Sequence, residues 1–76
     1  MKIEVLGSGC ARCKVLEQNT REAVATAGLD AEVVKVEDMQ AIMAYQIMAT
    51  PAIAVDGKVV STGKLLTAEE IIPLLQ

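Results

Sequence analysis

Two cysteines three positions apart are the residues of this sequence best suited to chemistry. Cys10 and Cys13 follow a glycine-rich turn, Gly7–Gly9, and stand where a helical pattern begins. Only the thiolate attacks a disulfide, and the unpaired N–H groups of a helix N-terminus favour that anion. Cysteines in this position have pKa values of about 3.5–7.5 instead of about 8.5. We therefore expect Cys10 to be an exposed catalytic nucleophile at the capping position of a helix.

The second cysteine has the spacing of a resolving thiol. Residues three apart are neighbours on a helix surface, and Cys13 shares the apolar face of Leu16. Cys13 can therefore attack a mixed disulfide formed on Cys10 and release the reduced substrate. The side chains of Arg12 and Lys14 are expected to help keep Cys10 ionised. This chemistry needs no cofactor other than the redox-active Cys10–Cys13 couple.

Two other interpretations of the cysteine pair stay open. The pair can be inert, because cysteine often behaves as a small apolar core residue. It can also bind a soft ion such as Cu(I) or As(III), and Gly7–Cys13 is similar to the Gly-Met-x-Cys-x-x-Cys loop of copper-chaperone domains. Copper-chaperone domains have the element order βαββαβ, which differs from the order βαβαββα that this sequence predicts. A structural zinc site is not expected, because zinc takes four ligands and the chain has no histidine and no third cysteine.

Three methionines are further candidates for soft-metal ligands, namely Met39, Met43 and Met48. Their helical spacing predicts that they pack in the core or in a groove instead. We therefore expect no resident metal ion.

Hydrophobic periodicity predicts the elements that hold the cysteines. Lys2–Leu6 and Ala31–Val36 have the pattern of strands. A helix from Cys10 to Ala27 lies between them, and Gly28 suits the left-handed position that ends a helix. Its predicted apolar face consists of Cys13, Leu16, Thr20, Ala23, Val24 and Ala27.

The second half of the chain contains two capped helices and a hairpin. Asp38 caps a short helix whose apolar face is Met39, Ile42 and Met43. Two strands, Ala52–Val55 and Lys58–Thr62, flank an Asp-Gly turn, which is a strong hairpin signal. Thr67–Glu70 is a capping box that opens the last helix, which Pro73 should shorten or bend.

The predicted order is βαβαββα, which defines the fold class as α/β. The strand–helix–strand start implies parallel pairing with a right-handed crossover, and the hairpin adds antiparallel strands. We expect one domain over residues 1–76, with a four-stranded mixed sheet and helices on both faces.

Composition and charge exclude several function classes. The net charge of −3 and the absence of a Lys/Arg cluster argue against a nucleic-acid partner. The first residues are too short and too charged for a signal peptide, and no apolar run approaches the ~20 residues of a membrane span. We therefore expect a cytoplasmic protein with no membrane partner. In that reducing compartment a lone cysteine pair is more often catalytic or metal-binding than structural.

The cysteine motif Gly9–Cys13 and the later Thr50–Gly57 segment resemble the thioredoxin superfamily, especially its small archaeal and bacterial redox-active disulfide proteins. The resemblance extends from Lys2 to Leu75. It implies a thioredoxin-like fold with a cis Pro51 beside the cysteines. It also implies that Thr50 offers its backbone to an extended substrate and that Gly63 lines the same groove.

The resemblance implies a thioredoxin- or glutaredoxin-like protein disulfide oxidoreductase. Its expected partners are a disulfide-containing protein or small molecule and an electron donor, either a reductase or a thiol, and we expect a monomer. The motif departs from thioredoxins, since Gly9 replaces their tryptophan and Ala11-Arg12 replaces Gly-Pro. The glutathione-binding residues of glutaredoxins are also absent. The alternatives are a soft-metal or metalloid binding module and a redox-regulated interaction domain.

Overall fold

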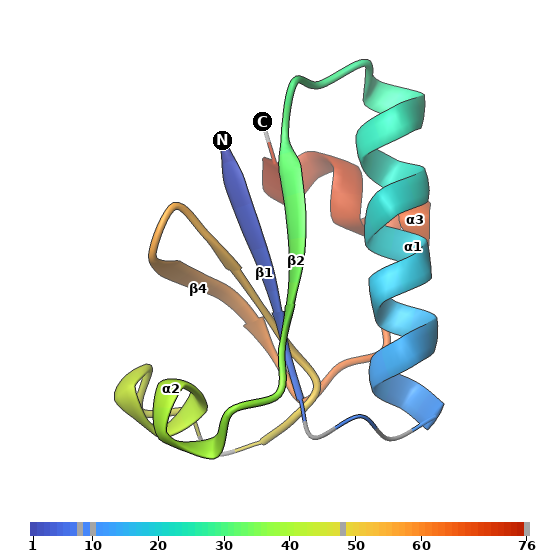
Figure 1. Cartoon of the computed structure of the whole chain (residues 1–76). Coiled ribbons are helices and arrows are strands. Elements are labelled where there is room, and N and C mark those ends of the chain that lie inside the picture. The colour runs from blue at the N-terminus through green and yellow to red at the C-terminus, as the bar shows by residue number, and fades with distance from the viewer. Residues whose placement is uncertain (8, 10, 48, 76) are drawn as a thin grey trace.

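Four strands form one mixed sheet in the order β2-β1-β3-β4 (Figure 1). The computed structural model describes residues 1–7, 9, 11–47 and 49–75. Its strands are β1 (Lys2–Leu6), β2 (Glu32–Val36), β3 (Ala52–Val55) and β4 (Lys58–Thr62). Its helices are α1 (Ala11–Ala27), α2 (Met39–Ala44), α3 (Ala68–Ile71) and the 3₁₀ helix η1 (Ile72–Leu75). The order βαβαββα is confirmed, and β2 begins one residue later than predicted.

Strand pairing brings three distant segments to one end of the sheet. β1 is parallel to β2, with Leu6 opposite Val36. β1 is antiparallel to β3, with Leu6 also opposite Ala52. The residues that follow β1 and β2 therefore lie beside the residue that precedes β3, which is Pro51.

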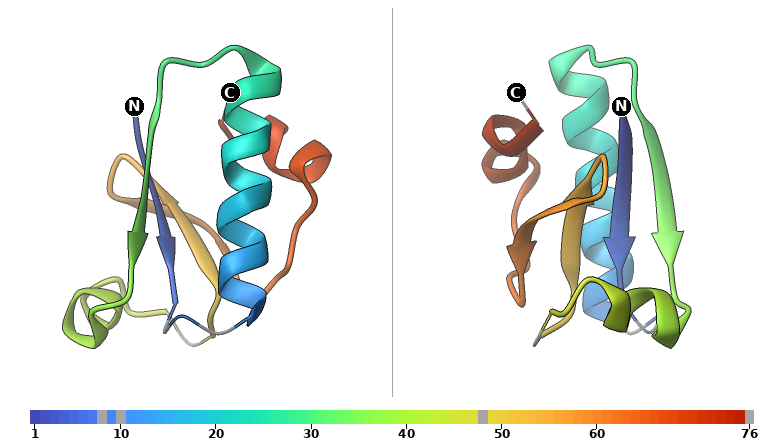
Figure 2. Two further views of the ribbon diagram at one scale, coloured as in Figure 1. Left: turned by 45° about the vertical axis from the view of Figure 1, so that its right-hand side comes forward. Right: turned by 90° about the vertical axis from the view of Figure 1, so that its left-hand side faces the viewer.

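Helices cover both faces of the sheet, as predicted (Figures 1 and 2). Ile3, Val5 and Ile53 pack with residues of α1, α3 and η1. Leu6, Ala52 and Ala54 pack with Ile42 of α2 on the other face. Because successive side chains of a strand point to opposite faces of the sheet, the two sets alternate along β1 and β3.

Helix α1 is held by a stripe of buried residues at helical spacing. Its buried residues are Cys13, Leu16, Thr20 and Ala23. Thr20 is polar, but its hydroxyl donates to the Leu16 carbonyl at 2.7 Å, so it is buried without an unmet hydrogen bond. Gly28 follows the helix with φ = 66°, the left-handed conformation predicted for it.

Capping and turn residues fix the remaining elements as the sequence predicts. Asp38 accepts a hydrogen bond from the Gln40 N–H at 3.3 Å, and Thr67 and Glu70 form the reciprocal capping box of α3. Asp56 and Gly57 both have positive φ, 50° and 85°, as a type I′ hairpin requires. Pro73 lies in η1, so the last helix changes from α to 3₁₀ winding just before it.

The packing predicted for the methionines is wrong at two of the three positions. Met39 and Met43 of α2 are 57% and 68% exposed. Helix α2 spans six residues and buries Ile42. Tyr45 and Ile47, which follow it, complete the contact with the sheet, so the methionine side chains are left facing solvent. Met48 lies outside the described residues.

Candidate active site

The loop after β1, the first turn of α1 and the segment before β3 meet at one end of the sheet (Figures 1 and 2). Gly7 belongs to the loop, and its N–H donates to the Val36 carbonyl at 3.0 Å, which ties the loop to the end of β2. The sequence predicted that the cysteine pair would follow the first strand and a glycine-rich turn, at the start of a helix.

Cys13 is buried, with 2% exposure, and its sulfur lies against the backbone of Gly7. A methyl group placed on Gly7 would overlap Cys13 Sγ and lie 3.0 Å from Cys13 Cβ. The same methyl group would lie 3.9 Å from Pro51 Cα. The absence of a side chain at position 7 therefore lets the Cys13 thiol and the Pro51 backbone approach each other.

The expected nucleophile, Cys10, lies outside the described residues, as does Ser8. Cys10 is bonded to Ala11, the residue at which α1 begins. Arg12 and Lys14 are exposed in the first turn of α1. Neither forms an ion pair with another residue that the structure describes. Their support of a Cys10 thiolate stays a prediction.

The peptide bond between Thr50 and Pro51 is cis, the isomer that the family resemblance implied. Pro51 is buried and Thr50, the residue before it, is exposed to solvent. The Pro51 carbonyl accepts a hydrogen bond from the Gly63 N–H at 2.8 Å. Thr50, Pro51 and Gly63 therefore lie together, although Gly63 is 12 positions after Pro51 in the sequence.

Gly63 is held in a conformation that suits glycine. Its φ is 67°, and a Cβ atom at this position would lie 2.9 Å from the Cβ of Ala49. Both the backbone and the neighbouring side chain therefore disfavour a larger residue here. The close approach keeps the turn after β4 against the segment that leads into Pro51.

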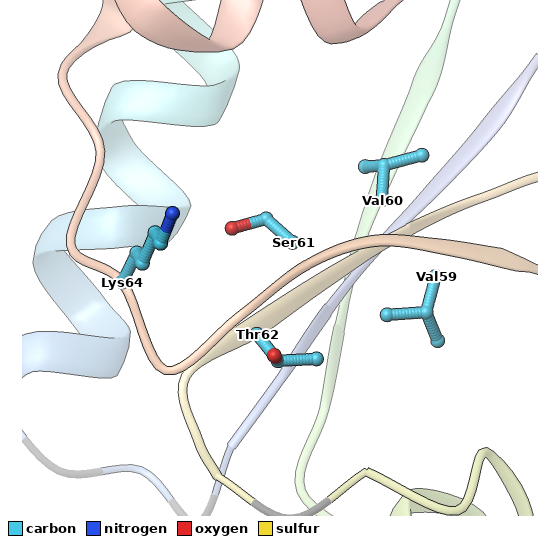
Figure 3. Close-up of a pocket in the computed structure, with 5 residues that line it drawn as sticks. All are labelled: Val59, Val60, Ser61, Thr62 and Lys64. Atoms are coloured by element: carbon cyan, nitrogen blue, oxygen red, sulfur yellow. The ribbon is translucent and has the colours of Figure 1, made fainter.

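An open pocket of about 350 Å³ lies next to this turn, lined by Val59, Val60, Ser61, Thr62 and Lys64. Figure 3 shows the Lys64 ammonium and the Ser61 hydroxyl directed toward the same space beside β4. The pocket therefore lies beside Gly63, and neither Cys13 nor Pro51 contributes to it.

Sequence reasoning missed one side chain at this end of the molecule. The carboxylate of Glu37, the residue after β2, lies against Gly9, whose φ is 83°. Glu37 Oε1 also forms an ion pair with Lys35 Nζ at 3.4 Å. The sequence could have indicated this contact. Strands β1 and β2 are parallel and therefore end at the same edge of the sheet, and Glu37 follows β2 directly.

A second charged contact lies on the α2 face. The Tyr45 hydroxyl donates to the Glu4 carboxylate of β1. This hydrogen bond raises the pKa of Tyr45 above its ordinary value of 10.0, and partial burial and the Glu4 charge act in the same direction. The contact fixes the end of α2 on the sheet.

The part of the chain that the structure describes contains no group of three or more His, Cys, Asp or Glu side chains placed to hold a metal ion. Within the same residues, no helix has the length and apolar character needed to cross a membrane.

Comparison with known proteins identifies the family. A sequence model described as "Thioredoxin domain" matches residues 1–76. A protein named thioredoxin from Methanothermobacter thermautotrophicus is 44% identical over 75 residues, which cover 99% of this chain and 97% of that protein. The chain belongs to the thioredoxin family. A thioredoxin from Methanocaldococcus jannaschii is 39% identical over 69 residues, covering 91% of this chain and 79% of that protein.

Family membership agrees with the resemblance noted from the sequence and with the four-stranded mixed sheet. In general terms, the chain is a thiol–disulfide oxidoreductase. Thioredoxins as a class act on disulfide substrates and receive electrons from a donor.

Proposed function

We propose that this chain reduces or exchanges disulfides of proteins or small molecules through Cys10 and Cys13. The observation that carries the proposal is the position of Cys13. Its sulfur is buried in the first turns of α1, against Gly7 and close to the cis Pro51. Cys10 is bonded to Ala11, the first residue of α1, so we expect both sulfurs at the same helix start, about one turn apart.

The proposed reaction transfers two electrons in two displacement steps. The Cys10 thiolate attacks one sulfur of the substrate disulfide, which forms a mixed disulfide and releases one substrate thiolate. The Cys13 thiolate then attacks the Cys10 sulfur and releases the second substrate thiolate, which leaves a Cys10–Cys13 disulfide. The substrate is reduced and the protein is oxidised. A reductase or a small thiol must return two electrons before the next cycle.

The burial of Cys13 suits it to the second step, the resolving attack. An exposed resolving thiol would itself react with substrates, whereas the thiol of Cys13, a residue with 2% exposure, is reached most directly by a neighbour on the same helix. The helix N-terminus, with Arg12 and Lys14 nearby in the sequence, favours the Cys10 anion. We expect Cys10 to have a pKa below about 7.5 for this reason.

We propose that the substrate lies along Thr50, Pro51 and Gly63. Thr50 is exposed beside the buried Pro51, and the 2.8 Å hydrogen bond from Gly63 holds the turn after β4 next to them. An extended substrate segment can pair with the Thr50 backbone while its disulfide faces the loop that contains Cys10. The site is proposed to work in a monomer.

We also propose the cytoplasm as the working compartment. A permanent bridge between Cys10 and Cys13 would close a loop too short to stabilise the fold much. Cysteine pairs in the cytosol are typically redox-active or metal-binding.

Cysteine variants test the proposal. With dithiothreitol as donor, the wild-type chain should accelerate the reduction of insulin disulfides, and Cys10→Ser should abolish the acceleration. Cys13→Ser should form mixed disulfides that persist, because the resolving attack is missing. Unchanged activity of Cys10→Ser would overturn the proposal. Stoichiometric binding of As(III) without any disulfide exchange would favour a metalloid-binding module instead.

A further inference from the structure

The carboxylate of Glu37 lies beside the residue that precedes the proposed nucleophile. Glu37 Cδ is 3.5 Å from the position that a Cβ atom on Gly9 would occupy, and the Oε2 atom is closer still. Gly9 is bonded to Cys10 in the sequence, so consecutive Cα atoms are about 3.8 Å apart. The negative charge of Glu37 therefore lies against the backbone of Gly9, the residue bonded to Cys10.

Gly9 makes this approach possible. Any side chain at position 9 would overlap the Glu37 carboxylate, and the φ of 83° also disfavours other residues. The tight contact and the positive φ occur at the same position. The loop conformation therefore lets the Glu37 carboxylate contact the backbone of Gly9, the residue before Cys10.

Near Glu37, charged groups come from two segments at this end of the sheet. On its own segment, Lys35 pairs with it at 3.4 Å, and Asp38 caps α2. The first turn of α1 contributes the exposed Arg12 and Lys14. The described part of the loop, Gly7 and Gly9, contributes no charge. Lys35 and Glu37 therefore form an ion pair at the end of β2. The Glu37 carboxylate of this pair contacts Gly9.

We propose that Glu37 is a positioning residue that disfavours the Cys10 thiolate and so makes the Cys10–Cys13 couple a stronger reductant, with Lys35 moderating its effect. This inference rests on the proposed function. A nearby negative charge destabilises an anion, whereas the disulfide form carries no charge at either sulfur. Since stabilising the reduced thiolate makes a couple more oxidising, destabilising it makes the couple more reducing.

The expected size of the effect follows from Coulomb's law. In water-like surroundings, two unit charges about 7 Å apart interact strongly enough to change a thiol–thiolate equilibrium by about threefold, or half a pKa unit. Above the thiol pKa, the equilibrium constant with glutathione should change by the same factor, which corresponds to about 15 mV for a two-electron couple.

Three charge-removing variants separate electrostatics from structure. In a Cys13→Ser background, Glu37→Gln should lower the pKa of Cys10 by about half a unit, measured from the pH dependence of alkylation. Lys35→Gln should raise that pKa. Glu32→Gln is the matched control, because Glu32 begins β2 and lies about 16 Å from Glu37 along the strand. At that distance a surface charge is largely screened, so the control should leave the pKa unchanged.

Salt and redox measurements complete the test. The Glu37→Gln shift should shrink in about 1 M salt, where the screening length falls to about 3 Å. With both cysteines present, Glu37→Gln should make the couple about threefold easier to reduce by glutathione. Equal pKa values for Glu37→Gln and Glu32→Gln, or a shift that salt does not reduce, would overturn the inference. Active disulfide exchange by the wild-type chain would then still support the proposed function.

Discussion

Replacing Gly7 by alanine tests the packing of the resolving cysteine directly. The φ of Gly7 lies outside the left-handed region, so the backbone itself accepts alanine. The added methyl group, however, overlaps Cys13 Sγ and lies 3.0 Å from Cys13 Cβ, and all three atoms are in a buried region. The cost is therefore steric, and overpacking of this kind destabilises a protein by about 1–3 kcal/mol.

The expected effect on melting temperature is large for a chain of 76 residues. A loss of 1 kcal/mol lowers the Tm of a domain of about this size by roughly 4–8 °C, so Gly7→Ala should lower it by about 5–20 °C. Urea unfolding followed by far-ultraviolet circular dichroism measures the free energy without relying on tryptophan, which the chain lacks. The measurement should be made under reducing conditions, so that disulfide formation does not contribute.

A double-mutant cycle identifies the clash as the cause. Cys13→Ala removes the sulfur that the new methyl group would overlap. Gly7→Ala should therefore cost less in the Cys13→Ala background than in the wild type, with a coupling energy of about 1 kcal/mol or more. Additive costs, or a Gly7→Ala variant as stable as the wild type, would refute the placement of Cys13 against Gly7.

Three further predictions concern the elements that support the site. Thr67→Ala removes the 3.2 Å hydrogen bond to the Glu70 N–H and should lower stability by about 1 kcal/mol in urea unfolding, and an unchanged midpoint would contradict the capping box. Tyr45→Phe should cost about 1 kcal/mol at neutral pH. Since the folded pKa of Tyr45 is raised, its contribution is present below the ordinary tyrosine pKa and is lost as the pH rises through the folded value, so the variant and the wild type should converge in strong alkali. Persistence of the difference there would argue against the Glu4 contact. Ile42→Ala should cost about 2–5 kcal/mol, whereas Met43→Ala should stay within about 0.5 kcal/mol of the wild type, because Ile42 is 4% exposed and Met43 is 68% exposed. Equal losses would contradict the observed orientation of α2.

The fold follows from local signals in this chain. The Asp56-Gly57 turn, the Thr67 capping box and the Gly28 helix end each have a short-range physical cause, and each lies where the sequence predicts. The methionines of α2 show where such reasoning fails. Helical spacing indicates which residues share a face, but whether a six-residue helix buries the whole face depends on where it meets the sheet.

The candidate site is predictable in part. The positions of Cys13 and Pro51 follow from the motif and from the family resemblance. The contacts of Gly7 with Cys13 and of Glu37 with Gly9 depend on the register of the parallel β1–β2 pair and on the antiparallel β1–β3 pair. Such long-range contacts have no short-range sequence signal, although Gly7 and Glu37 each follow directly after a strand and so belong to a sheet edge that the topology defines.

The proposed function depends most directly on the acidity of the Cys10 thiol. It is measured in the Cys13→Ser variant, which retains one cysteine, from the pH dependence of the alkylation rate. We predict a pKa below about 7.5, as expected for a thiolate favoured by a helix N-terminus. A pKa at or above about 8.5, the value of an ordinary cysteine, would contradict it.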